Sequence, residues 1–514
     1  MAFYLLHNYM DFIGEMMQTF LTKTSFKKVV LLDYLLEKDN WCAMEELRNL
    51  LNVTEKSVLH YIEELEDLFK QYNGNILLEN GDNKRFFIKK EKDFPIYNIY
   101  LHFYKASYNY HLIDFMYKYP RSVLKDFAKE QFTSVSTVFR YAKLLIPYFR
   151  RYHITFHPFQ LELNASEANI RSFFYYFYWN STRESSDKWP FHIEQKEIEK
   201  YIVAFEGIYD ITLTIFQKRV FSFWLAINIE RSSFRKVRVD NEYKSVISDD
   251  PHFNLLKKWS KQINLSFNSD ELCFLYRIIY SFGVIDGNAI YENSHAYAHQ
   301  RQNTCSYRAV ENLEKVLQSM FRFSLDIKDP ELIFNFIAFH ERSYLFYGNP
   351  DLFFNRSYIE EMKEEEPRTY HIMEKLKKEL QANADLDVSK KLENWAQLFL
   401  DYYYVLDYYD LFLTNVKPIK ILIQDDLHHT HRLWLMNKIN LYFGHSYVFA
   451  FYDYRTNITE VDLVISNYYI DTGKTPLLLM KNIPTERNWR LFEKTIYQLK
   501  KEKEVVKSAF CPEY

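Results

Sequence analysis

The segment "AMEELRNLLNVTEKSVLHYIEELEDLF", residues 43–69, decides how the N-terminal part of this chain folds. Apolar residues recur at helical spacing on both sides of the short link "LNV", and they do so again in the preceding residues 26–39. This periodicity predicts three successive helices, the last with Thr54 as its N-cap. Two helices joined by so short a turn are typical of a helix-turn-helix, whose second helix enters a DNA major groove.

The residues that follow predict a wing beside this helix-turn-helix. The stretch "ILLENGDNKRFFIKK", residues 76–90, has two β-prone runs around the turn signal "NGDN", which favours a β-hairpin. A similar order returns in residues 122–163, with a short helix, a turn, a longer helix starting near Ser134 and a β-like tail. We therefore expect two winged helix-turn-helix units in tandem, over residues 1–92 and 93–165.

The remainder of the chain divides into helical blocks and a short α/β segment. One helical pattern follows another, and two stretches of similar length predict a duplicated bundle at 166–285 and 286–405. Beyond Pro418, apolar strands alternate with helices, which is typical of a small domain with a parallel sheet, here 415–514. The predicted fold class is therefore mainly α and multidomain.

Composition excludes several classes of protein. The 514 residues carry a net charge of only −3, so a surface for nucleic acid must be local. Four cysteines lie far apart, which argues against a zinc site or disulfide framework and favours a reducing, cytoplasmic location. We expect no membrane insertion, because no apolar run reaches about 18 residues, and no export, because no leader is present. Without a phosphate-binding loop, metal-ligand cluster or nucleophile elbow, we expect neither an enzyme nor a bound cofactor or metal.

Charge differs between the two helix-turn-helix units. Residues 44–71 hold three Lys and Arg against seven Asp and Glu, whereas residues 121–153 hold seven against two, a local charge of +5. Basic side chains near a recognition helix bind phosphate oxygens, and short polar ones reach base edges. The DNA-binding candidates are Lys56, Ser57, His60, Tyr61, Lys84 and Arg85 in the first unit, and Ser134, Ser136, Thr137, Arg140 and Lys143 in the second. The alternative is that these charges are merely solvated.

The order of the modules resembles that of the Mga and AtxA family of virulence regulators of Gram-positive bacteria. The best local matches are "MEELRNLLNVTEKSVLHYIEELE" in the first helix-turn-helix and "LSFNSDELCFLYRIIY", residues 265–280, in the first helical block. The resemblance implies that the helical blocks are phosphotransferase-system regulation domains (PRDs) and that the tail is similar to an enzyme IIB subunit. It also implies control by phosphocarrier proteins of the sugar phosphotransferase system.

The PRD resemblance singles out particular histidines, because such domains typically carry two phosphate acceptors each. The four expected positions hold Asn228 and Ile278 in the first block, and His340 and Trp395 in the second. His340 also falls on an apolar helical stripe, so a core role for it is equally open. His192, near a helix start, is the second phosphorylation candidate. His295 and His299 share a helix face, but no third ligand for a metal stands nearby.

The C-terminal segment lacks the nucleophile that enzyme IIB subunits carry at the end of their first strand. This chain has Asp425 and Asp426 there, and two carboxylates would repel a phosphoryl group. The tail is therefore expected to be an inactive copy that serves as a dimerisation surface. His428 or His429 acting as a displaced acceptor is the alternative.

These patterns together predict a DNA-binding transcriptional regulator that works as a homodimer or larger homo-oligomer. Its expected partners are double-stranded DNA and phosphocarrier proteins, with no membrane partner. We hypothesise that phosphorylation at His340 changes the packing of the helical blocks and so the spacing of paired DNA-binding units. Two alternatives remain: an RNA-binding antiterminator, which would need a β-rich N-terminal module, and a phosphocarrier-type protein, which the missing acceptors disfavour.

Overall fold

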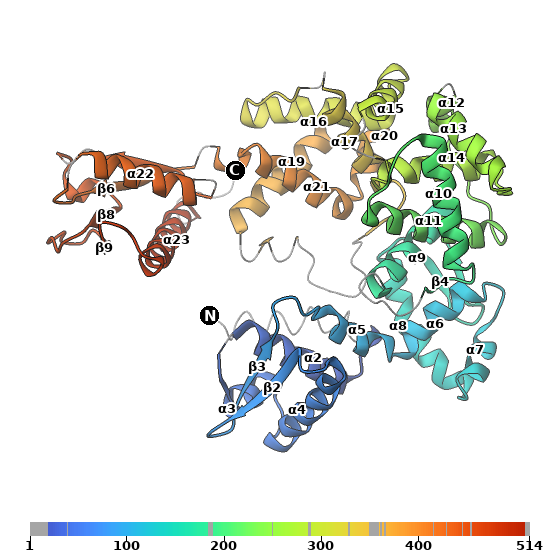
Figure 1. Cartoon of the computed structure of the whole chain (residues 1–514), viewed down its shortest axis with the longest axis horizontal. Coiled ribbons are helices and arrows are strands. Elements are labelled where there is room, and N and C mark those ends of the chain that lie inside the picture. The colour runs from blue at the N-terminus through green and yellow to red at the C-terminus, as the bar shows by residue number, and fades with distance from the viewer. Residues whose placement is uncertain are drawn as a thin grey trace. The chain divides into compact units, whose positions relative to one another are not determined.

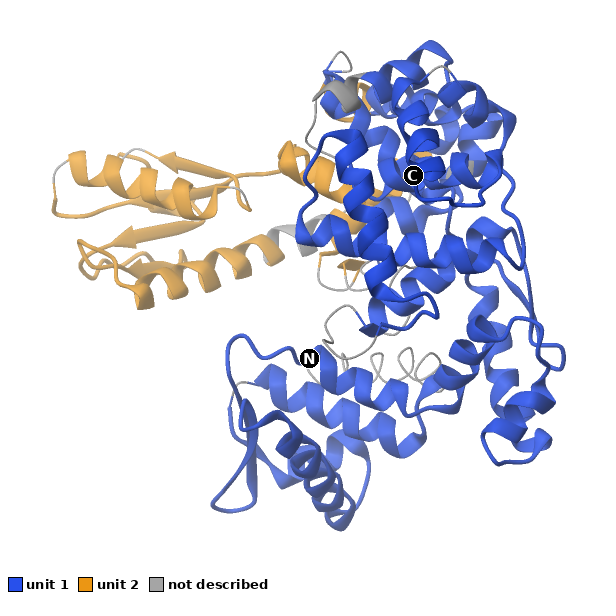
Figure 2. Ribbon diagram, turned by 45° about the vertical axis from the view of Figure 1, so that its right-hand side comes forward, with its two compact units in different colours: residues 1–316, 324–360, 379–399 blue, residues 317–323, 361–378, 400–514 orange. Residues whose placement is uncertain are grey.

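The computed structural model describes residues 19–508 apart from 39, 183–188, 249, 286–288, 327–328, 349–358, 360–361, 364–365, 415, 428, 445 and 453–454. The fold is mainly α and multidomain, as predicted (Figure 1). It divides into two compact units (Figure 2): residues 1–316, 324–360 and 379–399 form one, and residues 317–323, 361–378 and 400–514 form the other.

The first helix-turn-helix unit has the expected three helices and hairpin. Its elements are α2 (Lys23–Lys38), β1 (Cys42–Ala43), α3 (Met44–Leu51), α4 (Glu55–Phe69), the 3₁₀ turn η1 (Lys70–Tyr72), β2 (Ile76–Gly81) and β3 (Arg85–Lys90). The Thr54 hydroxyl accepts a hydrogen bond from the backbone N–H of Ser57, which confirms the N-cap. Strand β3 pairs with β1 and β2 in one antiparallel sheet. Leu47, Val58 and Leu65 are fully buried in this unit.

The second unit repeats this order of three helices and a hairpin after one additional helix, α5. Its elements are α5 (Tyr97–Lys105), α6 (Tyr108–Lys118), α7 (Leu124–Glu130), α8 (Val135–Arg150), β4 (Thr155–His157) and β5 (Glu162–Asn164). Ser134 caps α8, because its hydroxyl accepts from the backbone N–H of Thr137 at 3.1 Å. Strands β4 and β5 pair antiparallel and form the short second wing.

In the described residues between 167 and 408 all regular elements are helices, and aromatic side chains fill much of their core. The elements are α9 (Glu167–Thr182), α10 (Gln195–Tyr209), α11 (Ile215–Ser232), α12 (Asn241–Ser248), α13 (Pro251–Gln262), α14 (Ser269–Ser281), α15 (Ala289–Arg301), α16 (Cys305–Phe321), α17 (Pro330–Ser343), α19 (Pro367–Asn383), α20 (Leu386–Leu392) and α21 (Trp395–Tyr408). The buried Trp224 ring, for example, stacks on Tyr175 with centroids 4.5 Å apart. None of the helices in the described ranges has the length and apolarity that a membrane crossing requires.

A parallel sheet forms the C-terminal domain. The elements are η2 (Leu411–Leu413), β6 (Ile419–Ile423), α22 (His429–Phe443), β7 (Phe449–Tyr452), η3 (Ile458–Glu460), β8 (Leu463–Ser466), β9 (Leu477–Leu479) and α23 (Glu486–Ser508). The strand order is β7-β6-β8-β9, and all three pairings are parallel. Our sequence analysis did not identify β7, because this edge strand is short, half-buried and aromatic instead of a continuous buried aliphatic run.

Candidate nucleic-acid interface

One local pattern builds both helix-turn-helix units, and matched positions lie 80 residues apart (54 and 134, for example). The matched pairs are Glu46 and Asp126, which accept from an N–H at the start of the first helix; Thr54 and Ser134, which cap the second; and Val58 and Val138, which are fully buried. Because the backbones repeat while the surface side chains differ, the two recognition helices α4 and α8 can be compared position by position.

The start of α4 presents part of the predicted set of DNA-binding residues. Lys56 is exposed, and Ser57 is half-buried beside the N-cap. His60 is 62% exposed and lies 3.8 Å from the carboxylate of Glu64. Tyr61, by contrast, is only 9% exposed and belongs to the core. This burial argues against the predicted contact between Tyr61 and DNA.

Several cations of the first unit form ion pairs with nearby carboxylates. Lys84, at the tip of the wing, forms an ion pair with Glu55 at the start of α4, while Arg85 is exposed beside it. Lys28 lies 3.2 Å from a carboxylate oxygen of Glu64. Cations that already have carboxylate partners have less to gain from phosphate, so this unit is the weaker DNA-binding candidate.

Three hydroxyl side chains lie at the N-terminal end of α8, where the free backbone N–H groups of the helix point outward. Ser134 and Ser136 are exposed and Thr137 is half-buried. The Ser134 hydroxyl lies 3.0 Å from that of Ser136 and 2.8 Å from that of Thr137. Such a cluster can donate to phosphate oxygens or to base edges.

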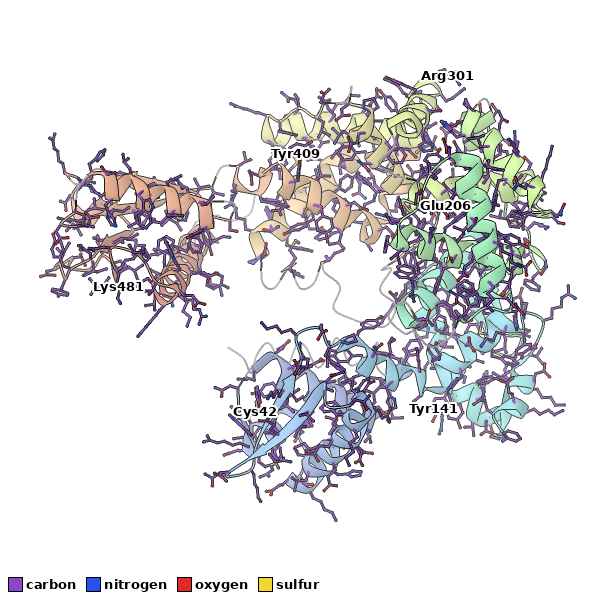
Figure 3. The ribbon with its side chains drawn as sticks, in the orientation of Figure 1. Cys42, Tyr141, Glu206, Arg301, Tyr409 and Lys481 are labelled. Carbon is purple, nitrogen blue, oxygen red and sulfur yellow. The ribbon has the colours of Figure 1, made fainter. Side chains whose placement is uncertain are left out.

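Arg140 and Lys143 lie further along α8, and both are exposed. The Arg140 guanidinium lies 5.2 Å from the ring centroid of Tyr141, and the Lys143 ammonium lies 4.7 Å from that of Phe139. The stacking of Phe139 on Phe159 of the second wing, at 4.2 Å, ties the wing to α8. Figure 3 labels Tyr141 on this helix. These cation–π contacts leave the positive charge of both side chains in place.

Several cations of the second unit have no carboxylate partner in the described chain, although Lys118 of the same unit pairs with Asp114. Within the described parts of the chain, no carboxylate lies within 4.0 Å of the charged group of Lys125, Lys129, Arg140 or Lys143. Helix α8 itself carries no acidic residue, whereas α4 carries five. The structure thus places the stronger anion-binding surface on α8.

The PRD-like acceptor positions of the helical blocks are all inaccessible. The exposed fractions are 0% for Asn228, 0% for Ile278, 1% for His340 and 4% for Trp395. A phosphoryl donor must approach its acceptor in line, and none of these side chains offers a path for that approach.

A buried ionic network surrounds Asn228. The Arg171 guanidinium donates to the Asn228 amide oxygen at 2.8 Å and to both Glu271 carboxylate oxygens at 2.5 and 2.9 Å. Its Nε donates to Glu167 at 3.1 Å, and Arg231 donates to the same carboxylate. Pairing and hydrogen bonding offset the cost of burying these charged side chains.

His340 lies in the apolar stripe of α17, beside the buried Ile333, Phe336 and Ile337. Its Nδ1 donates to the backbone carbonyl of Phe336 at 2.7 Å. Burial lowers the pKa of His340 to about 4, although the hydrogen bond to Phe336 opposes that shift. We therefore favour the core role for His340 over the phosphoacceptor role, because the ring is neutral and closed off from solvent.

The remaining histidines divide by exposure. His192 is exposed and makes an edge contact with the Tyr119 ring, with centroids 6.4 Å apart. His295 and His299 do share a face, with ring centroids 4.6 Å apart, but both are buried, and burial lowers the pKa of each to about 3. Across the described ranges, no cluster of three or more His, Cys, Asp or Glu could hold a metal ion.

Internal hydrogen bonds occupy the end of strand β6. The ring nitrogens of His431 lie 2.7 Å from a carboxylate oxygen of Asp425 and 2.7 Å from the carbonyl of Asn482. Asp426 accepts from Asn467. His429 is exposed at the start of α22, and His428 lies outside the described residues. The described part of this site has two carboxylates where the resemblance to an enzyme IIB subunit would place the nucleophile.

The sequence did not single out two residues, Arg171 and Phe132, whose environments in the structure are unusual. In the sequence, nothing distinguishes Arg171 from an ordinary surface cation, because its partners Asn228 and Glu271 lie far along the chain. Phe132 reads as part of an apolar pattern, yet it is 98% exposed. Its place two positions before Ser134, near which a helix was predicted to start, was the available signal.

Comparison with known proteins matches both N-terminal units. Residues 22–81 match the M protein trans-acting positive regulator (MGA) HTH domain, and residues 92–178 match the Mga helix-turn-helix domain. The capsule synthesis positive regulator AcpB of Bacillus anthracis is 20% identical over 90% of this chain and 96% of its own length. The anthrax toxin expression trans-acting positive regulator of the same organism is 20% identical over 92% and 98%. With matches to two Mga helix-turn-helix domains and similarity along nearly its whole length, this chain is similar to the Mga/AtxA-like family of regulators.

Proposed function

We propose that this chain is a transcriptional activator that binds double-stranded DNA mainly through α8, with α4 and its wing as a weaker second contact. The observation that carries the proposal is the charge contrast between two helices of the same local design. Contacts to phosphate supply much of the affinity for DNA, and α8 offers cations without competing carboxylates. The names of the two relatives, both positive regulators, support activation as the output.

The geometry of α8 suits a major groove. Ser136, Arg140 and Lys143 follow at intervals of four and three residues, so they share one exposed face of the helix. The opposite face, with Val138 and Ala142, is fully buried. In this arrangement Ser136 and Arg140 would reach base edges near the helix start, while Lys143 would contact a phosphate.

Assembly into a homodimer is proposed through the C-terminal domain. Its helices α22 and α23 expose apolar side chains that a lone soluble domain would tend to bury: Leu433, Leu441, Tyr442, Leu491 and Tyr497. Two copies of α8 in one dimer would bind two half-sites, which raises affinity and sets their spacing. Light scattering of the full chain, and of a Leu441→Lys variant, tests this surface.

Control by phosphocarrier proteins is proposed at His192 instead of His340. His192 is the exposed candidate, whereas His340 is closed within α17. Incubation with a radiolabelled, phosphorylated phosphocarrier protein tests the choice. We expect label in the wild-type chain and in His340→Ala, and its loss in His192→Ala. Label lost in His340→Ala and kept in His192→Ala would show that the buried acceptor opens.

The two alternative functions have less support. An antiterminator needs a small β-rich RNA-binding module, whereas the described N-terminal residues form helices with short wings. A phosphocarrier-type protein would use the PRD-like acceptor positions, and all four are buried, which leaves His192 as the exposed candidate.

Gel-shift titrations with genomic DNA fragments over a series of salt concentrations test the DNA-binding proposal. We expect Arg140→Ala and Lys143→Ala each to weaken binding and to lower the slope of log K against log salt by about one. Lys200→Ala, an exposed cation on α10, is the matched control and should bind as wild type. Equal slopes for all four proteins would remove α8 from the interface.

A further inference from the structure

Phe132 lies in the turn between α7 and α8 and has no place in the core. Its side chain is 98% exposed, more than any other large apolar residue in the described parts of the chain. Its backbone is left-handed, with φ at 48°, a conformation that bulky side chains rarely adopt. Both features disfavour phenylalanine at this position on grounds of folding alone.

The backbone around Phe132 explains what the fold needs there. The N–H of Phe132 donates to the carbonyl of Lys129, and that of Thr133 donates to the carbonyl of Ala128 at 3.0 Å. This pattern ends a helix with one left-handed residue, usually Gly or Asn. The matched position of the first unit is Asn52, with φ at 47° and the same bond from the next residue to Arg48. The fold therefore requires a left-handed residue, and the ring of Phe132 is an addition to that requirement.

Phe132 is an exposed apolar side chain in a unit with unpaired cations. These features together suit a partner that is negatively charged and carries apolar groups at particular points. Lys129 precedes it by three residues, and Arg140 and Lys143 follow on the exposed face of α8, all without carboxylate partners in the described chain. Glu130 is the exposed acidic neighbour, and Asp126 is engaged as the cap acceptor for Val123. Val135, Leu144 and Phe159 of the same unit are also exposed, but a partner protein would need an interface of about 1,000 Å² or more, and we favour DNA because these side chains share the unit with unpaired cations.

We propose that Phe132 contacts the C5-methyl group of a thymine in the major groove and so acts as a sequence-specificity residue of the second helix-turn-helix unit. The inference rests on the proposed binding of DNA through α8. Phe132 stands at the leading end of that helix, next to the hydroxyl cluster of Ser134, Ser136 and Thr137. The thymine methyl is the apolar feature of the major groove, and aromatic side chains pack on it.

Thymine and uracil differ only by this methyl group, which gives a chemical test. A 30-base-pair duplex is first selected from a randomised pool by the wild-type full-length chain. It is then synthesised with single thymines replaced by deoxyuridine, and each version is titrated with wild type, Phe132→Asn and Phe132→Leu. We expect one or two replacements to weaken wild-type binding about fourfold, the worth of one buried methyl. Phe132→Asn should bind the thymine duplex as weakly as wild type binds the uracil duplex, and it should not respond to uracil.

The variants separate folding from recognition. Asn occupies the matched left-handed position in the first unit, so Phe132→Asn should keep a melting temperature equal to or above that of wild type. Phe132→Leu keeps an apolar side chain and should retain part of the uracil response. Phe216→Asn, which removes an aromatic ring that is 63% exposed on α11, is the matched control and should bind both duplexes as wild type.

Several outcomes would overturn the inference. If Phe132→Asn binds as wild type, or if it remains sensitive to uracil, Phe132 does not contact a thymine methyl. If Phe132→Asn binds weakly while wild type ignores every uracil replacement, the ring contacts another part of the DNA. If the wild-type chain selects no duplex at all, the proposed function itself has failed.

Discussion

Replacing Arg171 with Met should sharply destabilise the first helical block. The change removes five hydrogen bonds: two to Glu271, and one each to Glu167, Asn228 and the carbonyl of Arg235. Glu167 keeps its contacts to Arg231. Glu271, which is 1% exposed, would keep only the backbone N–H of Val237. Removing one partner of a buried ion pair lowers the free energy of unfolding by about 3–5 kcal/mol. This is a large share of the roughly 5–15 kcal/mol by which a domain is typically stable.

Calorimetry of the full chain, together with tryptophan fluorescence, measures this loss. Trp224 and Trp259 are both fully buried in the same block and report its unfolding. We expect the transition of this block to fall by about 10 °C, given the enthalpy typical of domains of this size. The double variant Arg171→Met with Glu271→Met should recover much of the loss, because it leaves no unpaired charge behind.

An exposed ion pair serves as the control. Arg490 and Glu486 on α23 are 74% and 80% exposed, so Arg490→Met should leave the unfolding transition in place. The reasoning would be refuted if Arg171→Met cost less than about 1 kcal/mol, the worth of one ordinary hydrogen bond. It would also be refuted if the double variant were less stable than Arg171→Met alone.

Two further predictions concern acid and helix caps. The pKa of His340 is about 4 in the folded chain against 6.5 for the free side chain, so the unfolded chain binds more protons between those values. Stability should therefore fall as the pH drops below about 6.5, and by pH 5 His340 alone should contribute a loss of about 2 kcal/mol. Urea unfolding at pH 7 and pH 5 checks this. Between these pH values the free energy of unfolding of His340→Gln should fall by about 2 kcal/mol less than that of wild type. An equal fall in both proteins would mean that the ring is not buried in solution. Thr54→Ala and Ser134→Ala should each destabilise their own helix-turn-helix unit by about 1 kcal/mol, measured by chemical denaturation, and a neutral result would contradict the observed caps.

Short-range features of the N-terminal units were predictable because neighbouring residues create them. The caps at Thr54 and Ser134 depend on a side chain and an N–H three residues apart. The hairpin of β2 and β3 depends on one turn, and the helices depend on apolar spacing within each segment. The parallel C-terminal sheet was predictable for a similar reason, since strands alternating with helices leave few other arrangements. The edge strand β7 was not predicted, because the strand is short and only half-buried and so lacks a continuous buried apolar run.

The amino-acid sequence by itself determined where helices begin, which unit carries the positive charge, and which family the module order resembles. Only the tertiary structure decided which side chains are reachable. Tyr61 turned out to be buried and Phe132 exposed, and His340 closed within α17. Arg171 meets Glu271 across 100 residues of chain. The physical reason is that exposure and ion pairing depend on contacts between segments far apart in sequence, which local periodicity does not encode.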